Sequence, residues 1–337
     1  MSIIRIIYAG SPAIAVPALE ALAGLPPTDA VELAGVLTNP DSPRGRHGKP
    51  DPTDVGAAAA VLIERFERAG RSPPVVLKPE KLGSQARGEL EALRPDLLVS
   101  FAYGRIFGPK FLALFPQGGV NIHPSLLPAY RGPTPIPQAI LNGDRETGIT
   151  IQRLALEMDS GDILAQEAFP LTGVETTATL SEEMARRAAL LLPPVLTELA
   201  AGTLKARAQE NDKASYCGLL SKEAGCIDWN KSAAQIEAQI RAYTPWPLSW
   251  TFHGDQYLYI LKAVPGTISA SGTTSGTITT PGTVLGVDTG RGILVQTGDG
   301  VLALTMLQYR TKKALEWRTF LNGARDLIGA RLGKITD

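Results

Sequence analysis

The stretch IIRIIYAGSPAIAVPALEALA, residues 3–23, is an apolar run followed by a helix-like segment. Ile3–Tyr8 is rich in β-branched residues and nearly free of polar ones, which predicts a strand buried on both faces of a sheet. Gly10 and Pro12 then predict a tight turn and a helix that begins near the proline. The G-x-G-x-x-G pattern is missing from this turn, so the turn does not indicate a dinucleotide site.

The same alternation continues as far as about residue 204. Further strand-like runs are Val31–Leu37, Pro74–Leu77, Leu97–Ala102, Gly119–Ile122, Gly148–Leu154 and Asp162–Phe169. The remaining helix-like segments are Asp51–Ala69, Leu82–Leu93, Pro109–Phe115, Pro135–Leu141 and Thr177–Ala200. Strands that alternate with helices in this way predict βαβ units. We therefore expect an α/β fold, with an open, mostly parallel sheet and helices on both of its faces.

The character of the sequence changes at residues 205–215, KARAQENDKAS, whose polar composition predicts a linker. Beyond it, Ala233–Ala242 has the spacing of a short amphipathic helix, and the rest consists of short strand-like runs with Gly-rich turns. This pattern predicts a small β-barrel of the oligonucleotide-binding type or a small sandwich. We expect one domain at residues 1–204 and a second at 216–337. The Gly/Ser/Thr-rich segment Pro265–Thr283 is expected to form a long hairpin or loop.

The composition excludes several classes of protein. The 337 residues include two Cys and three His, too few and too widely spaced for a disulfide framework or a metal site. No stretch approaches the roughly 20 apolar residues of a membrane span, and the start of the chain resembles a strand more than a signal peptide. We therefore expect a cytoplasmic protein that needs no metal and does not bind a membrane.

The 33 basic and 33 acidic residues give a formal charge of zero, which by itself argues against a nucleic-acid partner. The total hides two different parts. Residues 1–204 carry 18 Lys and Arg against 22 Asp and Glu, whereas residues 205–337 carry 15 against 11. The first part is therefore negative and the second positive, and a positive barrel can hold an RNA backbone by shape and charge.

The residues most suggestive of chemistry lie within 119–166. Asn121 and His123 end a predicted strand and, being two residues apart, point to the same side. They lie at the carboxyl edge of the sheet, where α/β proteins usually bind ligands. A proline-rich loop, 124–137, follows, and a further strand leads to Asp159 in a Gly-containing turn. We expect these three side chains to lie on converging segments.

An Asn, a His and an Asp in this arrangement could carry out acyl transfer. The amide could donate to a developing oxyanion, the imidazole could move protons, and the carboxylate could orient the ring and favour its protonated form. No Ser or Cys nucleophile is needed if the attacking group is a substrate amine. A structural histidine and a turn-forming aspartate explain the same residues equally well, so the residues alone leave both interpretations open.

The run NIHPSLLPAYRG, together with TGITIQRLALEMDSGDIL, resembles the signature of the folate-dependent formyltransferases. The resemblance implies a Rossmann-like first domain and 10-formyltetrahydrofolate as formyl donor and co-substrate, without a metal. It also implies that Asn121, His123 and Asp159 are the catalytic residues. The residues implied to line the site of the folate head group are Ser125, Leu126, Leu127 and Pro128.

Nearly the whole chain, from RIIYAGSPAIAVPAL to VQTGDGVLALTMLQ, resembles the members of this family that formylate methionine on an initiator tRNA. The resemblance therefore implies initiator methionyl-tRNA as acceptor and partner. The loop Thr38–Pro50 holds cations among glycines, with donors suited to phosphates, and in the family this loop contacts the acceptor stem. The candidate tRNA contacts are Arg44, Arg46, Lys49, Lys205, Arg207, Lys262, Arg310, Lys312 and Lys313.

Other interpretations stay open. The acceptor could be an amino sugar nucleotide, or water in a 10-formyltetrahydrofolate hydrolase module, because the chemistry would be the same. The chain could also be a non-catalytic RNA-binding protein, although the intact Asn, His and Asp argue against this. The basic residues could equally be scattered surface cations. A monomer is the default expectation.

Overall fold

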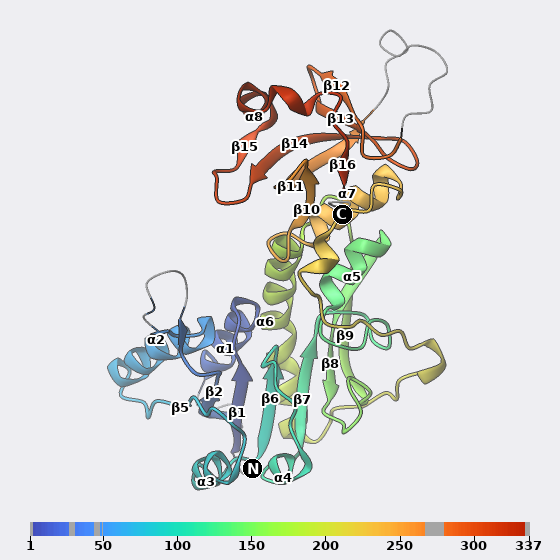
Figure 1. The fold of residues 1–337 in the computed structure, drawn as a ribbon. Coiled ribbons are helices and arrows are strands. Elements are labelled where there is room, and N and C mark those ends of the chain that lie inside the picture. The colour runs from blue at the N-terminus through green and yellow to red at the C-terminus, as the bar shows by residue number, and fades with distance from the viewer. Residues whose placement is uncertain (1–2, 27–30, 44–47, 49, 267–279, 334–337) are drawn as a thin grey trace. The chain divides into compact units, whose positions relative to one another are not determined.

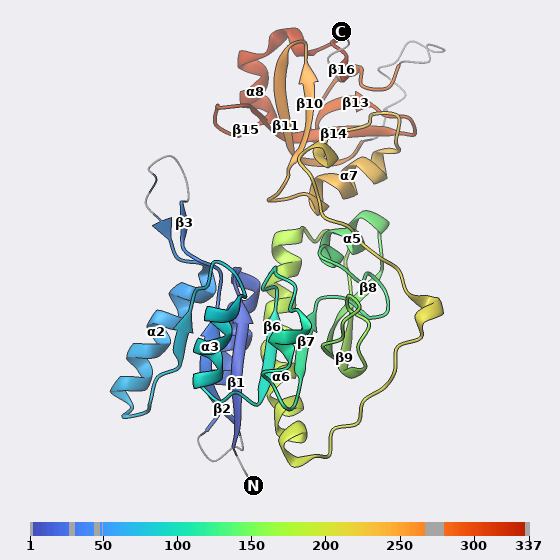
Figure 2. The same ribbon diagram turned by 60° about the horizontal axis from the view of Figure 1, so that its bottom comes forward.

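The structure is a computed structural model that describes residues 3–26, 31–43, 48, 50–266 and 280–333. The chain divides into two compact units, each with its own sheet (Figures 1 and 2). The first unit comprises Met1–Pro135, Glu146–Pro170 and Ser181–Gly218. The second unit comprises Ile136–Arg145, Leu171–Leu180 and Leu219–Asp337.

The first unit contains a seven-stranded sheet in the order β5-β2-β1-β6-β7-β8-β9. The strands are β1 Ile4–Gly10, β2 Val31–Leu37, β5 Val75–Leu77, β6 Leu97–Phe101, β7 Gly119–His123, β8 Glu146–Arg153 and β9 Ile163–Pro170. The first five in spatial order are parallel, whereas β8 is antiparallel to both β7 and β9. No helix intervenes between β8 and β9, and such a short connection suits antiparallel neighbours. The predicted open, mostly parallel sheet is confirmed.

Helices pack on both faces of this sheet. The helices before residue 205 are α1 Val16–Ala23, α2 Asp54–Arg68, α3 Ser84–Ala92, α4 Pro109–Leu112, α5 Pro135–Asn142 and α6 Thr177–Ala201, of which α5 belongs almost entirely to the second unit. From β1 the chain adds β2 and β5 on one side of the sheet, and it then crosses back to add β6 and β7 on the other side. Right-handed crossovers therefore place α1 and α2 on one face and α3 and α4 on the other (Figure 1). Helix α2 begins after Thr53, whose hydroxyl accepts a hydrogen bond from Gly56 N at 2.9 Å.

The second unit contains an antiparallel sheet in the order β12-β13-β14-β11-β10-β16. The strands are β10 Ser249–His253, β11 Gln256–Gly266, β12 Val284–Asp288, β13 Gly292–Gln296, β14 Val301–Tyr309 and β16 Leu332–Gly333, with β15 Leu315–Glu316 beside β14. Thr283 and Arg331, which directly precede the two edge strands, form a bridge to each other. The sheet thus curls towards closure, which confirms the predicted small barrel and not the sandwich.

The Leu219–Asp337 part of this unit contributes the helices α7 and α8. Helix α7, Ala233–Ala242, has the bounds predicted from the sequence. A capping box formed by Ser232 and Gln235 fixes its start. Helix α8 spans Trp317–Gly323. Of the predicted segment Pro265–Thr283, residues 267–279 lie outside the described residues. Among the described helices of the chain, none has the length and apolar character needed to cross a bilayer.

Residues 205–218, named the strap below, extend along the first unit. Arg207 and Ile163 exchange backbone hydrogen bonds of 2.8 and 2.9 Å, and Arg131 pairs with Tyr216. Gln209 is only 9% exposed. The polar composition that predicted a linker therefore includes side chains that form hydrogen bonds inside this unit. The last of the boundaries between the units follows Gly218, three residues beyond the end of the predicted linker.

The barrel core offers a test of the fold. Leu304 on β14 is fully buried, whereas Val287 on β12 is 46% exposed. Leu304→Ala is expected to lower the free energy of unfolding of the second unit by about 2–5 kcal/mol, and Val287→Ala by no more than about 1 kcal/mol. Urea unfolding followed by tryptophan fluorescence measures this unit alone, because all four Trp residues lie within Leu219–Asp337. Equal losses in the two variants would contradict this core.

Candidate active site

The carboxyl end of β7 places Asn121 and His123 next to each other in the first unit. They alternate with Val120 and Ile122, which are buried. Asn121 is half-buried and His123 is 4% exposed. In the antiparallel pair with β8, Gln152 lies opposite Asn121. The predicted Asn and His therefore share one side of the strand, beside a polar residue of the neighbouring strand.

Asp159 lies in the turn between β8 and β9 with a positive φ of 50°. Its carboxylate accepts hydrogen bonds from three groups. Asn121 Nδ2 lies 3.3 Å and Gln152 Nε2 lies 3.0 Å from Oδ1, and the backbone N of Gly132 lies 2.9 Å from Oδ2. The structure thus brings the predicted Asp and Asn together, and it surrounds the carboxylate with donors.

His123 lies between this carboxylate and a backbone carbonyl. Its Nδ1 is 3.6 Å from Asp159 Oδ2, and its Nε2 is 2.9 Å from the Tyr130 carbonyl oxygen. A carbonyl oxygen only accepts, so Nε2 carries a proton and Nδ1 faces the carboxylate. Burial lowers the pKa of His123, while Asp159 and then the Tyr130 carbonyl raise it by a smaller amount. The ring is therefore neutral at pH 7, and Asp159 stabilises a proton taken up at Nδ1.

The predicted folate segment follows directly, and its four residues differ in exposure. Ser125 and Leu127 are 1% and 2% exposed, whereas Leu126 and Pro128 are only half-buried. Thr150 on β8 and Gln166 on β9 hold the backbone in place: the Thr150 hydroxyl donates to the Ser125 carbonyl at 2.7 Å, and Gln166 Nε2 donates to the Leu127 carbonyl at 2.9 Å. The segment is thus a fixed edge of the site, with two of its side chains turned inward.

The predicted basic residues are not all placed together. Arg44, Arg46 and Lys49 lie outside the described residues, between the paired strands β3 Ser42–Pro43 and β4 Pro50–Asp51. Lys205 and Arg207 are exposed on the strap of the first unit, while Lys262, Arg310, Lys312 and Lys313 are exposed on the second unit.

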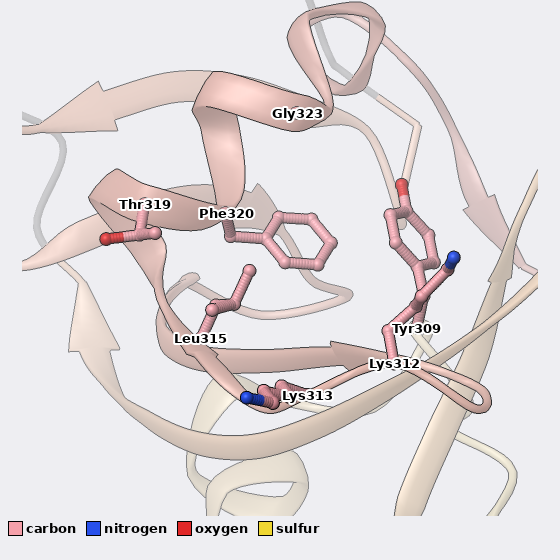
Figure 3. A pocket seen from close by; sticks show the side chains of 7 residues that line it. All are labelled: Tyr309, Lys312, Lys313, Leu315, Thr319, Phe320 and Gly323. Atoms are coloured by element: carbon pink, nitrogen blue, oxygen red, sulfur yellow. The ribbon is translucent and has the colours of Figure 1, made fainter.

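Lys312 and Lys313 flank an open pocket of about 290 Å³ in the barrel unit (Figure 3). Tyr309 and Phe320 form its aromatic wall, with ring centroids 4.8 Å apart. The Tyr309 hydroxyl also lies 2.8 Å from His253 Nδ1. The pocket thus combines an apolar interior with two cations at its rim, and it lies in a different unit from the Asn121, His123 and Asp159 site.

Several residues that shape the site were not predicted. Gln152 is 1% exposed on β8, directly opposite Asn121, and a polar residue between the apolar Ile151 and the strand end was a signal that could have found it. Gly132 and Tyr130 contribute only backbone groups, which no side-chain pattern reveals. Gln209 lies in the strap among other polar residues, and nothing in the sequence pattern sets it apart from them.

The thiol beside this site in the first unit is Cys217, whose Sγ lies 3.6 Å from the Tyr130 carbonyl oxygen. Burial raises the pKa of this thiol, so the sulfur stays protonated at neutral pH. Within the described ranges, no group of three or more His, Cys, Asp and Glu is arranged to hold a metal ion. An amide donor, an imidazole and a carboxylate held together suit acyl transfer to a substrate amine.

Comparison with known proteins points to the same chemistry. The chain matches the formyl transferase family over residues 5–196 and the formyl transferase C-terminal domain over residues 219–325. A methionyl-tRNA formyltransferase of Treponema denticola is 47% identical over 96% of this chain and 98% of its own length. One from Treponema pallidum is 44% identical over 98% and 99%, and one from Roseiflexus castenholzii is 40% identical over 98% and 99%.

Solved structures share the fold. An N-formyltransferase from Helicobacter canadensis, in complex with folinic acid and dTDP-3-aminofucose, matches 90% of this chain and 99% of its own with a TM-score of 0.61 at 20% identity. A sugar 3N-formyl transferase matches 93% and 100% with a TM-score of 0.60 at 18% identity. With both family domains present and the relatives named above 40–47% identical along nearly its whole length, the chain belongs to the formyl transferase family.

Proposed function

We propose that this protein transfers the formyl group of 10-formyltetrahydrofolate to the α-amino group of methionine on initiator tRNA, giving N-formylmethionyl-tRNA for translation initiation. The observation that carries the proposal is the meeting of Asn121 and His123 with Asp159 in one site of the first unit. Relatives named for this activity match 96% and 98% of the chain, which supports methionyl-tRNA as the acceptor.

The residues present fit a formyl donor. In the described part of the chain, the Asn121 amide meets one acceptor, Asp159 Oδ1, so its second N–H hydrogen can meet the formyl oxygen. Leu126 and Pro128 are half-buried and offer apolar contact to the flat head group of the folate. The folate supplies an activated formyl group when bound. Asn121 then stabilises the negative charge that develops on the formyl oxygen.

Asp159 and His123 transfer the proton that leaves the methionyl amine. The methionyl amine forms a bond to the formyl carbon, the bond from this carbon to the folate nitrogen breaks, and one proton passes from the amine to the departing nitrogen. Asp159 Oδ2 and His123 Nδ1, 3.6 Å apart, form a shared site that can accept this proton and return it, directly or through water. Because the imidazole is neutral at rest, the pair can take up a proton at neutral pH.

The basic residues are proposed to hold the tRNA. Lys262, Arg310, Lys312 and Lys313 are exposed cations on the second unit, and exposed cations bind RNA phosphates without reading bases. The loop with Arg44, Arg46 and Lys49 is proposed to meet the acceptor end. In this proposal residues 1–204 catalyse the transfer and residues 216–337 bind the tRNA. The protein acts as a monomer in the cytoplasm.

Formyl transfer from 10-formyltetrahydrofolate to charged initiator tRNA tests the proposal. An amino sugar nucleotide and water serve as competing acceptors in the same reaction. Formyl on the methionine of the tRNA is the expected result. Formyl on the sugar, formate release alone, or tRNA binding without turnover would each contradict the proposal.

Asn121→Ala is expected to lower kcat by about 10²–10³-fold, because loss of one oxyanion donor typically costs this much. Asn142→Ala is the matched control, since Asn142 is an exposed asparagine on helix α5 that accepts a hydrogen bond from Gln138 one turn earlier. Steady-state kinetics with purified enzyme check the result. A near-normal kcat for Asn121→Ala would exclude this role.

Arg46→Ala is expected to raise the KM for tRNA on the order of tenfold and to leave folate binding unchanged, since a charge-assisted phosphate contact contributes about 1.5–3 kcal/mol. The matched control is Arg68→Ala, which removes an exposed arginine paired with Glu64 on helix α2. Kinetics at several salt concentrations should also show a smaller salt dependence for Arg46→Ala. Equal tRNA kinetics for both variants would reject the contact.

A further inference from the structure

Arg131 carries a buried charge whose partners are neutral. The residue is 3% exposed. Its Nε and Nη2 donate to Gln209 Oε1 at 3.1 and 2.8 Å, Nη2 donates to Asn211 Oδ1 at 2.7 Å, and Nη1 donates to the Tyr216 hydroxyl at 3.2 Å. A guanidinium has no acceptor and stays charged, so every atom that it meets must accept. Arg131 therefore fixes the Gln209 amide with its oxygen towards the guanidinium.

The Gln209 amide nitrogen then points to the opposite side. Its Nε2 lies 3.1 Å from Gln152 Oε1, 2.9 Å from the Asp159 carbonyl oxygen and 2.7 Å from the Gly161 carbonyl oxygen. The two hydrogens of this amide are shared among three accepting oxygens, so one side chain of the strap binds the Asp159 and Gly161 carbonyls and also Gln152. The same contact sets the orientation of Gln152, whose oxygen must face Gln209.

The orientation of the Gln152 amide in turn determines which of its atoms faces the Asp159 carboxylate. With its oxygen towards Gln209, its Nε2 donates to Asp159 Oδ1 at 3.0 Å. Each amide in the series accepts from one neighbour and donates to the next, and the series begins at a permanent cation and ends at a carboxylate. Charge-assisted hydrogen bonds at both ends strengthen such a series.

We propose that Arg131, Gln209 and Gln152 form a one-way hydrogen-bond relay that positions the Asp159 carboxylate towards His123. The three act as positioning residues, since each works through Asp159. The relay makes the strap part of the site, although Gln209 lies 50 residues from Asp159 in sequence. Two further titratable groups adjoin the relay in the described structure: the thiol of Cys217, at the Tyr130 carbonyl, and the phenol of Tyr216, at Arg131. Formyl transfer as a readout rests on the proposed function.

Gln209→Glu in the full-length chain separates the relay from simple support of Arg131. The variant keeps the shape of the side chain and gives Arg131 a better partner, but its carboxylate cannot donate to Gln152 or to the Asp159 turn. We expect kcat to fall by at least about tenfold and up to about 10²-fold, as for a misplaced catalytic group, with the KM of both substrates within about threefold.

Tyr216→Phe is the control, because it removes a different partner of Arg131 and Tyr216 is 68% exposed. Its kcat should stay within about threefold of wild type. If Gln209→Glu also retained wild-type kcat, Gln209 would serve only to support the buried Arg131, and the relay would be overturned.

Imidazole NMR of substrate-free protein gives a second readout that does not depend on the reaction. Gln209→Met adds no charge, and it should lower the titration midpoint of His123 relative to wild type, because Asp159 raises the pKa of His123 only while it is held near the ring. A lowered midpoint in the variant, together with no formyl transfer by the wild-type protein, would support the relay and reject the proposed function. An unchanged midpoint, with formyl transfer intact in Gln209→Met, would overturn the relay and leave the function standing.

Discussion

The Asp159 carboxylate is the group on which the geometry of the site depends. Its oxygens receive hydrogen bonds from Asn121 on β7, from Gln152 on β8 and from the backbone of Gly132 in the loop after β7. Each of these donors would cost about 1–3 kcal/mol if it were left buried and unpaired. One carboxylate therefore holds two strands and a loop at a common point, and it faces the His123 ring from there.

Two glycines allow the backbone to come close enough around this carboxylate. Gly132 has a φ of 115°, and a Cβ there would lie 2.2 Å from the Cys217 carbonyl oxygen of the strap. A Cβ on Gly161 would lie 1.9 Å from the Arg153 carbonyl oxygen. Side chains at either position would push apart the segments that Asp159 joins. The proline-rich loop, the Asp159 turn and the strap thus form one packed arrangement around the carboxylate.

Local signals were enough to predict much of this molecule. Apolar runs alternating with helix-like segments predicted the sheet, and the spacing of two residues placed Asn121 and His123 on one side of β7. The residues alone also placed Asp159 on a segment converging with them, but the catalytic roles of Asp159 and His123 needed the family resemblance, because a turn-forming aspartate and a structural histidine look the same. Gln209 could not be predicted, since a polar segment has the same composition whether water or a partner satisfies it. Its partner Arg131 lies 78 residues away, and only the folded chain brings the two together.

The geometry of the site requires both carboxylate oxygens of Asp159 to accept hydrogen bonds. Asp159→Asn keeps the shape of the side chain but replaces one acceptor oxygen with a donor, which then meets the donors of Gln152, Asn121 or Gly132. Single-turnover formyl transfer with saturating 10-formyltetrahydrofolate and charged initiator tRNA measures the chemical step alone. The account predicts a transfer rate at least about 10³-fold below wild type, with both substrates still bound. A rate within about tenfold of wild type would contradict it.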